Sequence, residues 1–241
     1  MEEWFGGSAH DGFTFFSTSH IVMIIFYFII LIALLYIYKK ILARPFLLNT
    51  IRWSLAGFLL LLEITYQIWM VVNDMWHPSH SLPLQICSIA VILAIIALAT
   101  LNKNMIIITF FVGFIPAGLT IITPELTFDF PHYRFWDFFL HHIILSCVSL
   151  YLVLVYKVRV TFKTTLAAFG VLLLYALVIG AFINPMFGGN YLFLSDSPEN
   201  ETLINFLGTG GIYIVNLVIV GFVVFMISFG IYKMVVRLRE E

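Results

Sequence analysis

Seven histidines and two cysteines are the residues of this chain best suited to proton transfer or nucleophilic attack near neutral pH. If hydropathy and basic residues define the two sides of a membrane, all the histidines fall in loops or helix halves on the outer side. The histidines are His10, His20, His77, His80, His132, His141 and His142. We therefore expect any chemistry to lie on that side.

Cys87 and the adjacent histidines His141 and His142 form the main candidate for a reactive centre. A cysteine attacks as its thiolate, so it needs a base within hydrogen-bond reach. The helical rise places Cys87 at a depth from the outer surface that resembles the depth of both histidines. This pattern predicts a catalytic pair of Cys87 with His142 or His141, in which Asp137 or Glu63 orients the imidazole.

Acyl chemistry at such a pair also needs hydrogen-bond donors for the negatively charged oxygen of a tetrahedral intermediate. Gln85, Thr123 and Asn190 are the candidate donors on the same side. Other polar residues that reach the outer half, and that we expect to support the site, are Gln67, His20, His132, Arg134 and Tyr191. For Glu63 and Gln67, one helical turn apart, a purely structural hydrogen bond is an equal alternative.

Other chemistries could use the same residues. Asp74, His77 and His80 have loose metal-ligand spacing without a recognised zinc signature, so we expect no metal and no other cofactor. Glu63 and Asp137 could relay protons in a transporter, but polar groups become sparse toward the opposite side. A non-enzymatic receptor or transporter that binds a lipid or small molecule in the same cavity is the remaining alternative.

Membrane-spanning helices are the elements that must position these residues. The 241 residues are 62% hydrophobic and 10% charged, which leaves too little polar surface to enclose a single water-excluded core. An apolar helix of about 20 residues crosses the hydrocarbon layer. Seven such runs predict an all-α polytopic protein in which residues 1–241 form one transmembrane domain: 20–42, 50–72, 82–101, 104–122, 133–156, 163–186 and 209–235.

Basic residues predict the orientation of this domain. All but one of the 12 Lys and Arg residues flank the same side of the expected helices, and only Arg134 lies on the other. The positive-inside rule then puts the N-terminus outside and the C-terminus in the cytoplasm. A net charge of −1 without a further basic patch argues against nucleic-acid binding. We expect a multi-pass protein of the plasma membrane whose partners are membrane phospholipids or other fatty-acyl esters, with the oligomeric state left open.

Five short motifs combine polar and aromatic residues at the outer ends of the expected helices. They are FFSTSH at 15–20, LPLQICS at 82–88, TP at 123–124 followed by PHYRF at 131–135, FFLHH at 138–142 and NYLFL at 190–194. In this order they resemble the bacterial YwaF family of multi-pass membrane proteins and its animal relatives, the transmembrane protein 164 family. The resemblance extends over about residues 15–235.

The resemblance implies a cysteine-dependent lipid acyltransferase that moves a fatty acyl chain between phospholipids. More distant relatives are implied to hydrolyse fatty-acid esters of hydroxy fatty acids. Cys87 matches the implied nucleophile, and His142 matches the histidine of the FF-x-x-H pattern that is the implied base. We therefore expect an acyltransferase or acyl hydrolase of bacterial lipid remodelling that acts near the outer leaflet.

Overall fold

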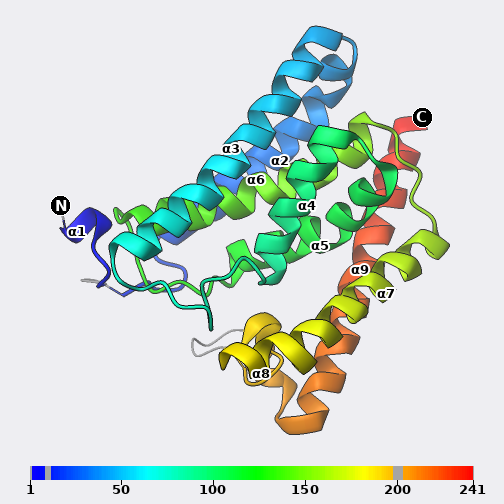
Figure 1. The fold of residues 1–241 in the computed structure, drawn as a ribbon. Helices are drawn as coiled ribbons and strands as arrows, with labels where there is room; N and C mark the ends of the chain where they lie inside the picture. Colours follow the sequence, from blue (N-terminus) through cyan, green and yellow to red (C-terminus); the bar gives the residue numbers. More distant parts are fainter. Residues whose placement is uncertain (1, 9–11, 198–202, 241) are drawn as a thin grey trace.

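The computed structural model describes residues 2–8, 12–197 and 203–240, and these are helical apart from loops and one isolated bridge between Gly12 and Phe128 (Figure 1). In chain order the helices are α1 (Glu2–Phe5), α2 (Thr18–Leu42), α3 (Pro45–Val72), α4 (Ile86–Thr100), α5 (Lys103–Ile122), α6 (Tyr133–Val155), α7 (Phe162–Val178), the π-helical η1 (Ile179–Ile183), α8 (Asn184–Phe187), the 3-10 segments η2 (Tyr191–Phe193) and η3 (Leu203–Leu207), and α9 (Gly210–Glu240).

Within the described ranges, six helices are long and apolar enough to cross a membrane. They are α2, α3, α5, α6, α9 and the continuous helix Phe162–Phe187 made of α7, η1 and α8. α4 is apolar too but has 15 residues, which makes it about 22 Å long against a hydrocarbon layer of about 30 Å. The chain is therefore a multi-pass, all-helical membrane protein, and its expected third span is a shorter helix than the sequence predicted.

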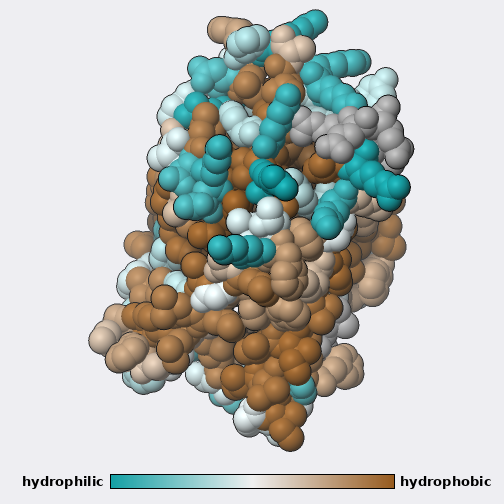
Figure 2. All heavy atoms as spheres, turned by 90° about the vertical axis from the view of Figure 1, so that its right-hand side faces the viewer, coloured by the Kyte–Doolittle hydropathy of each residue, from teal (hydrophilic) through white to brown (hydrophobic). Residues whose placement is uncertain are grey.

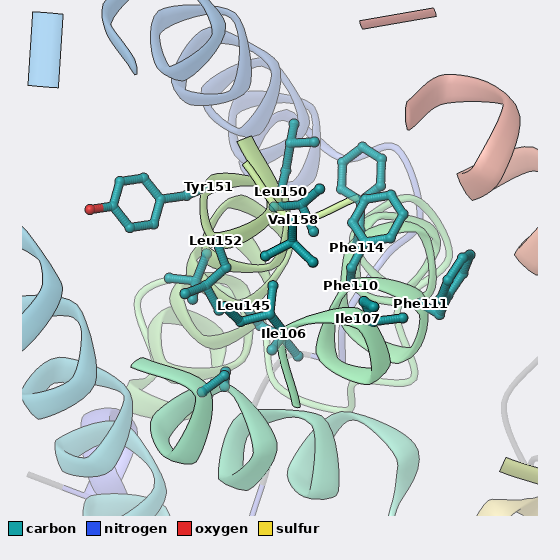
Figure 3. Close-up of a cluster of buried hydrophobic side chains, with 14 of the residues drawn as sticks. Ile106, Ile107, Phe110, Phe111, Phe114, Leu145, Leu150, Tyr151, Leu152 and Val158 are labelled. Carbon is teal, nitrogen blue, oxygen red and sulfur yellow. The ribbon is translucent and has the colours of Figure 1, made fainter. Parts of the chain in front are cut away.

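α6 lies at the centre of the bundle, where α2, α3, α4 and α5 pack around it. Phe110 and Ile106 of α5 lie beside Leu145 of α6 in the main hydrophobic cluster (Figure 3). Gly113 permits the close approach of these two helices, because a methyl group at its position would collide with Oγ of Ser149. This tight contact fixes the height of α6 relative to α5.

α7 and α9 pair with each other and extend away from the other helices, with contacts to α5 along part of their length (Figure 1). Much of their surface is apolar and exposed, as at Leu174 and Ile212, where the exposed fractions are 63% and 71%. Figure 2 shows this hydrophobic surface over the lower half of the molecule. Exposed apolar surface of this extent is expected where lipid rather than water surrounds the helices.

The connections between helices bring the ends of α4, α5 and α6 together. Leu101, in the left-handed region with φ 55°, ends α4, and the side chain of Asn102 accepts hydrogen bonds from the first turn of α5. α4 and α5 are therefore antiparallel neighbours, and the start of α4 lies beside the end of α5 and the start of α6. We call this end of the bundle the outer end, following the orientation predicted from the basic residues, and the opposite end the inner end.

α4 begins at Ile86, which corrects the prediction that this span begins at residue 82. The preceding backbone has other partners: the N–H of Leu82 donates to the hydroxyl of Tyr191 at 3.0 Å. The carbonyl of Leu84 accepts from the hydroxyl of Tyr175 at 2.8 Å. With these groups bound elsewhere, 82–85 forms a turn, and Cys87 lies in the first turn of α4.

Candidate active site

Cys87, His141 and His142 lie at similar heights in the bundle. α4 and α6 pack against each other and both pack against α5. Counted from the inner ends of α4 and α6, the helical rise puts all three residues about 20 Å toward the outer end. By this estimate the expected nucleophile and both expected bases lie at one level of the contact between α4, α5 and α6.

Cys87 occupies a helix N-terminus that no side chain caps. It is the second residue of α4, half-buried, and packs against the main core. The N-cap residue Gln85 makes no side-chain cap hydrogen bond, and its carbonyl accepts the first helical bond, from Ile89 N at 3.0 Å. The N–H groups of Ile86, Cys87 and Ser88 precede that bond, so they have no acceptor within the helix. Amides in this position favour a negative charge.

Thr120 is a neighbour of the cysteine that the sequence analysis missed. Its Oγ1 lies 4.0 Å from Sγ of Cys87 and donates to the carbonyl of Pro116 at 3.0 Å. The thiol is therefore the donor in its contact with Thr120. Among the described residues, neither imidazole forms a hydrogen bond with this thiol. The available signal was a hydroxyl at the outer end of an apolar helix, one turn after an internal proline.

His142 has the tautomer that a general base requires. Its Nδ1 lies 2.7 Å from the carbonyl oxygen of Phe138, one helical turn earlier. A carbonyl oxygen only accepts, so Nδ1 carries the proton and Nε2 carries the lone pair. No residue in the described ranges forms a hydrogen bond with Nε2 of His142. The backbone of α6 thus orients this ring and leaves its basic nitrogen unoccupied.

Arg134, Asp137 and His141 share the face of α6 that packs against α3. The guanidinium of Arg134 forms an ion pair with Asp137 and lies 4.1 Å from the ring centre of Tyr66 on α3. His141 is buried, with its ring centre 5.6 Å from that of His142. The carboxylate of Asp137 is thus paired with Arg134. The imidazole of His142 is oriented by the backbone carbonyl of Phe138 instead of by Asp137 or Glu63.

Glu63 and Gln67 form a hydrogen-bonded pair that holds the loop before α4 against α3. Nε2 of Gln67 donates to Glu63 at 3.2 Å and to the carbonyl of Ser81 at 3.0 Å, while the indole of Trp76 donates to Oε1 of Gln67 at 3.0 Å. The second oxygen of Glu63 is buried without a hydrogen-bond partner in the described ranges. These bonds support the structural alternative for the pair.

The amide nitrogen of Gln85 has no hydrogen-bond partner among the described residues, whereas the donor groups of the other two expected oxyanion residues each make a hydrogen bond. Oε1 of Gln85 accepts from the N–H of Leu192 at 2.9 Å, which orients the amide and leaves Nε2 without a partner among the described residues. The hydroxyl of Thr123 donates to a carbonyl of its own helix at 3.1 Å. The amide of Asn190 binds the backbone of its own loop at 2.8–3.2 Å. Of the three, Gln85 is also the one that lies next to the start of α4, two residues before Cys87.

A hollow of about 230 Å³ lies at the outer end, beside Gln85. It is lined by Ser79, His80, Gln85, Glu125, Asn190, Phe193 and Ser197. Ligand sites for whole drug-sized molecules are usually about 300–1,000 Å³. The hollow therefore has room for a polar head group, while a longer acyl chain would have to extend between helices.

His20 holds the start of α2 against the end of α5. The N–H of Phe16 donates to Nδ1 of His20 at 3.0 Å, so Nε2 carries the proton and donates to the carbonyl of Ile121 at 2.9 Å. The ring is completely buried among aromatic side chains. With both nitrogens bound, this histidine supports the fold rather than the chemistry.

His132 caps α6 and ties it to the N-terminal segment. Its Nδ1 accepts from the N–H of Arg134 at 3.1 Å, and its Nε2 donates to the carbonyl of Gly6 at 3.0 Å. Burial lowers the pKa of His132 from the usual 6.5, and the charge of Arg134 lowers it further, while the bond to Gly6 opposes both. The neutral ring is the form that can act as a cap.

Tyr191 anchors the loop that precedes α4. Its buried hydroxyl donates to the carbonyl of Pro78 at 2.7 Å and accepts from Leu82.

The rings of His77 and His80 stack with centres 6.0 Å apart, and both contact the hydroxyl of Ser79. No group of three or more His, Cys, Asp or Glu in the described ranges is placed to hold a metal ion. His10 lies outside the described residues.

These features define the class of protein: a multi-pass helical membrane protein with a cysteine, two histidines and uncapped backbone amides near its outer end. The sequence model of the TMEM164 family matches residues 15–229, and the chain belongs to this family. The expected relation to the animal transmembrane protein 164 family is thus confirmed. No curated protein and no solved structure matches the chain.

Proposed function

We propose that this protein is an acyltransferase or acyl hydrolase that acts on phospholipid or other fatty-acyl esters near the outer leaflet of the plasma membrane. One arrangement carries the proposal. Cys87 lies in the uncapped first turn of α4, and His142, at the same height by the helical rise, has an unprotonated Nε2. A nucleophile, a base and backbone oxyanion donors are the parts that acyl transfer needs.

The first half-reaction forms an acyl-enzyme. Sγ of Cys87 attacks the ester carbonyl carbon while Nε2 of His142 takes the thiol proton. The resulting oxyanion accepts hydrogen bonds from the backbone N–H of Cys87 and from Nε2 of Gln85. When the intermediate collapses, the carbon–oxygen bond of the ester breaks, and His142 gives the proton to the leaving oxygen. The products are a thioester on Cys87 and a lysophospholipid or other alcohol.

The second half-reaction releases the acyl chain. The hydroxyl of an acceptor lipid attacks the thioester, His142 takes its proton, and the same proton returns to Sγ as the carbon–sulfur bond breaks. Water in place of the acceptor gives hydrolysis. Because Cys87 packs against the hydrophobic core, we favour a lipid acceptor over water.

The depth of the site suits a glycerophospholipid. By the helical rise, Cys87 lies about 20 Å from the inner end of α4, within the span of a hydrocarbon layer of about 30 Å. Ester bonds of a phospholipid lie just below the head groups, and a lipid could approach from the side, between helices. This depth would align the ester with Cys87 without withdrawing the substrate from the membrane.

A receptor or transporter that binds a lipid or small molecule without chemistry is the second candidate. The contact of Cys87 with Thr120 favours it, because a thiol that donates to a hydroxyl is not activated by a base. For catalysis, the thiol has to rotate from Thr120 toward His142. The two candidates therefore differ in whether Cys87 becomes acylated.

An acyl-exchange assay tests the proposal. The purified protein would be reconstituted in vesicles with a phospholipid carrying an isotopically labelled acyl chain and an unlabelled lysophospholipid acceptor. Cys87→Ala should reduce label transfer to the uncatalysed rate. Cys147→Ala is the matched control and should retain transfer, because Cys147 packs beside the apolar cluster of Met23 and Tyr27. Undiminished transfer by Cys87→Ala would rule out the cysteine mechanism.

A further inference from the structure

A cleft of about 1260 Å³ lies at the inner end of the bundle, opposite the candidate active site. It is formed by the end of α6, the connection 156–161, the start of α7 and the last turns of α9. Four of its lining residues are basic, and no Asp or Glu lines it within the described ranges: Lys157, Arg159, Lys233 and Arg237. Figure 2 shows hydrophilic side chains gathered over the upper half of this side of the molecule.

The connection after α6 holds two of these basic residues in fixed positions. Val158 and Val160 are buried while Lys157 and Arg159 are exposed, so the extended segment alternates between core and surface. The hydroxyl of Tyr232 on α9 accepts from the N–H of Val160 at 3.1 Å and donates to the carbonyl of Val158 at 3.2 Å. The segment is thereby bound to α9, and its two charges lie on the cleft side.

The same cleft also exposes apolar side chains. Lys233 and Arg237 lie one turn apart on α9, so they share a face, and the ammonium of Lys233 is 5.2 Å from the ring centre of Phe229. Phe162 and Met234 line the cleft with exposed fractions of 54% and 58%. A soluble anion would leave this apolar surface uncovered. An amphiphile would use both kinds of surface.

We propose that this cleft binds an anionic phospholipid of the leaflet at the inner end. Its phosphate would lie among Lys157, Arg159 and Lys233, and its acyl chains would follow Phe162 and Phe229. Basic pockets between transmembrane helices are known binding sites for acidic lipid head groups. The cleft volume of about 1260 Å³ is above the usual upper range of about 1,000 Å³ for small-molecule sites, which leaves room for a lipid head group and the first part of its chains. The proposal does not depend on acyl transfer, because the cleft lies at the other end from Cys87.

Membrane orientation alone does not account for this arrangement. The positive-inside rule requires basic residues on one side of the membrane and places no condition on their sharing a cleft. Lys39, Lys40 and Lys103 belong to the same side by sequence but do not line the cleft. They therefore supply a matched control with the same change in charge.

Lipid-dependent stabilisation of the full chain in detergent tests the proposal. The Tm would be measured during titration with dioleoylphosphatidylglycerol, with dioleoylphosphatidylcholine, and with soluble glycerol 3-phosphate, since a bound ligand raises the stability of the folded state. We expect the anionic lipid alone to raise the Tm strongly. Equal effects of both lipids, or an effect of glycerol 3-phosphate equal to that of the anionic lipid, would overturn the proposal.

Charge-removing variants locate the binding. The triple variant Lys157→Asn, Arg159→Gln, Lys233→Gln should raise the apparent Kd for the anionic lipid about 100-fold. The control variant Lys39→Gln, Lys40→Gln, Lys103→Gln removes the same charge outside the cleft and should bind as the wild type does. An unchanged Kd in the cleft variant would contradict the proposal.

If the triple variant does not unfold cooperatively, its Tm cannot be used, and a single variant then tests the lipid site. Lys157 lies in the left-handed region with φ 50°, which asparagine tolerates well, so Lys157→Asn should preserve the backbone. It should raise the Kd about fivefold. A Kd equal to that of the wild type would exclude Lys157 from the lipid site and refute the proposed phosphate position.

Discussion

At the scale of single residues, the two adjacent histidines of α6 differ in one hydrogen bond, which only His142 makes. Nδ1 of His142 donates to Phe138, which leaves Nε2 as a base, whereas His141 has no hydrogen bond within the described part of the chain. We predict that His142→Gln lowers the rate of acyl transfer by about 10²–10⁴-fold, the usual contribution of a general base. His141→Gln should cause a much smaller loss. Equal losses in single-turnover transfer would contradict the assignment of His142 as the base.

Residue types predicted which side chains could do chemistry, but not which of them already use their polar atoms in hydrogen bonds within the fold. His20 and His132 look like candidates in the sequence. Their ring partners lie 101 and 126 positions away, so only the folded chain shows that both nitrogens of each ring are bound. The free Nε2 of Gln85 likewise depends on its contact with Leu192, which is 107 positions away.

At the scale of helices, the contact of α5 with α6 allows a test of packing. Gly113→Ala should lower the free energy of unfolding by about 1–3 kcal/mol, because the added methyl meets Oγ of Ser149. Ser149→Ala in the same chain should recover part of the loss, since the Cβ of residue 149 lies 3.4 Å away. Gly57→Ala, which meets nothing within 4 Å, is the control for thermal unfolding in detergent. A Gly113→Ala loss no greater than that of the control would contradict the close approach.

The N-cap of α6 should make the fold sensitive to acid. Because burial lowers the pKa of His132 below 6.5 in the folded state, the unfolded chain binds more protons as the pH falls through 6.5. The stability that neutral His132 provides is thus complete above pH 6.5 and is lost as the pH falls toward the folded-state pKa. His132→Asn keeps a capping acceptor that does not titrate. The Tm of this variant should therefore fall less than the Tm of the wild type between pH 7.5 and about 5. An equal fall in the wild type and the variant would contradict the role of His132 as a titrating cap.

Hydropathy alone predicted most helices of this fold, because long apolar runs have few alternatives in a membrane. The start of α4 is the exception. Residues 82–85 are apolar enough to continue the helix, but their backbone groups bind Tyr191 and Tyr175, which lie in distant parts of the sequence. Contacts of this kind have no local signature. They place Cys87 at a helix N-terminus, which the sequence analysis did not foresee.

At the scale of the whole molecule, the short α4 decides the topology. If it crosses the membrane with the six longer helices, the termini lie on opposite sides. If it does not, they lie on the same side. We predict that external protease in intact cells removes a tag from the N-terminus and leaves a C-terminal tag intact. Equal protection or equal removal of both tags would contradict the predicted orientation.

In the proposed reaction, Cys87 carries the acyl chain as a thioester and His142 acts as its base. The most direct measurement is the mass of the purified protein, and of its Cys87 peptide, after incubation with a labelled phospholipid in the absence of an acceptor. We expect a labelled thioester on Cys87 that disappears when a lysophospholipid is added and does not form in His142→Gln. Acyl exchange that proceeds while Cys87 stays unmodified, or a label found on another residue, would contradict it.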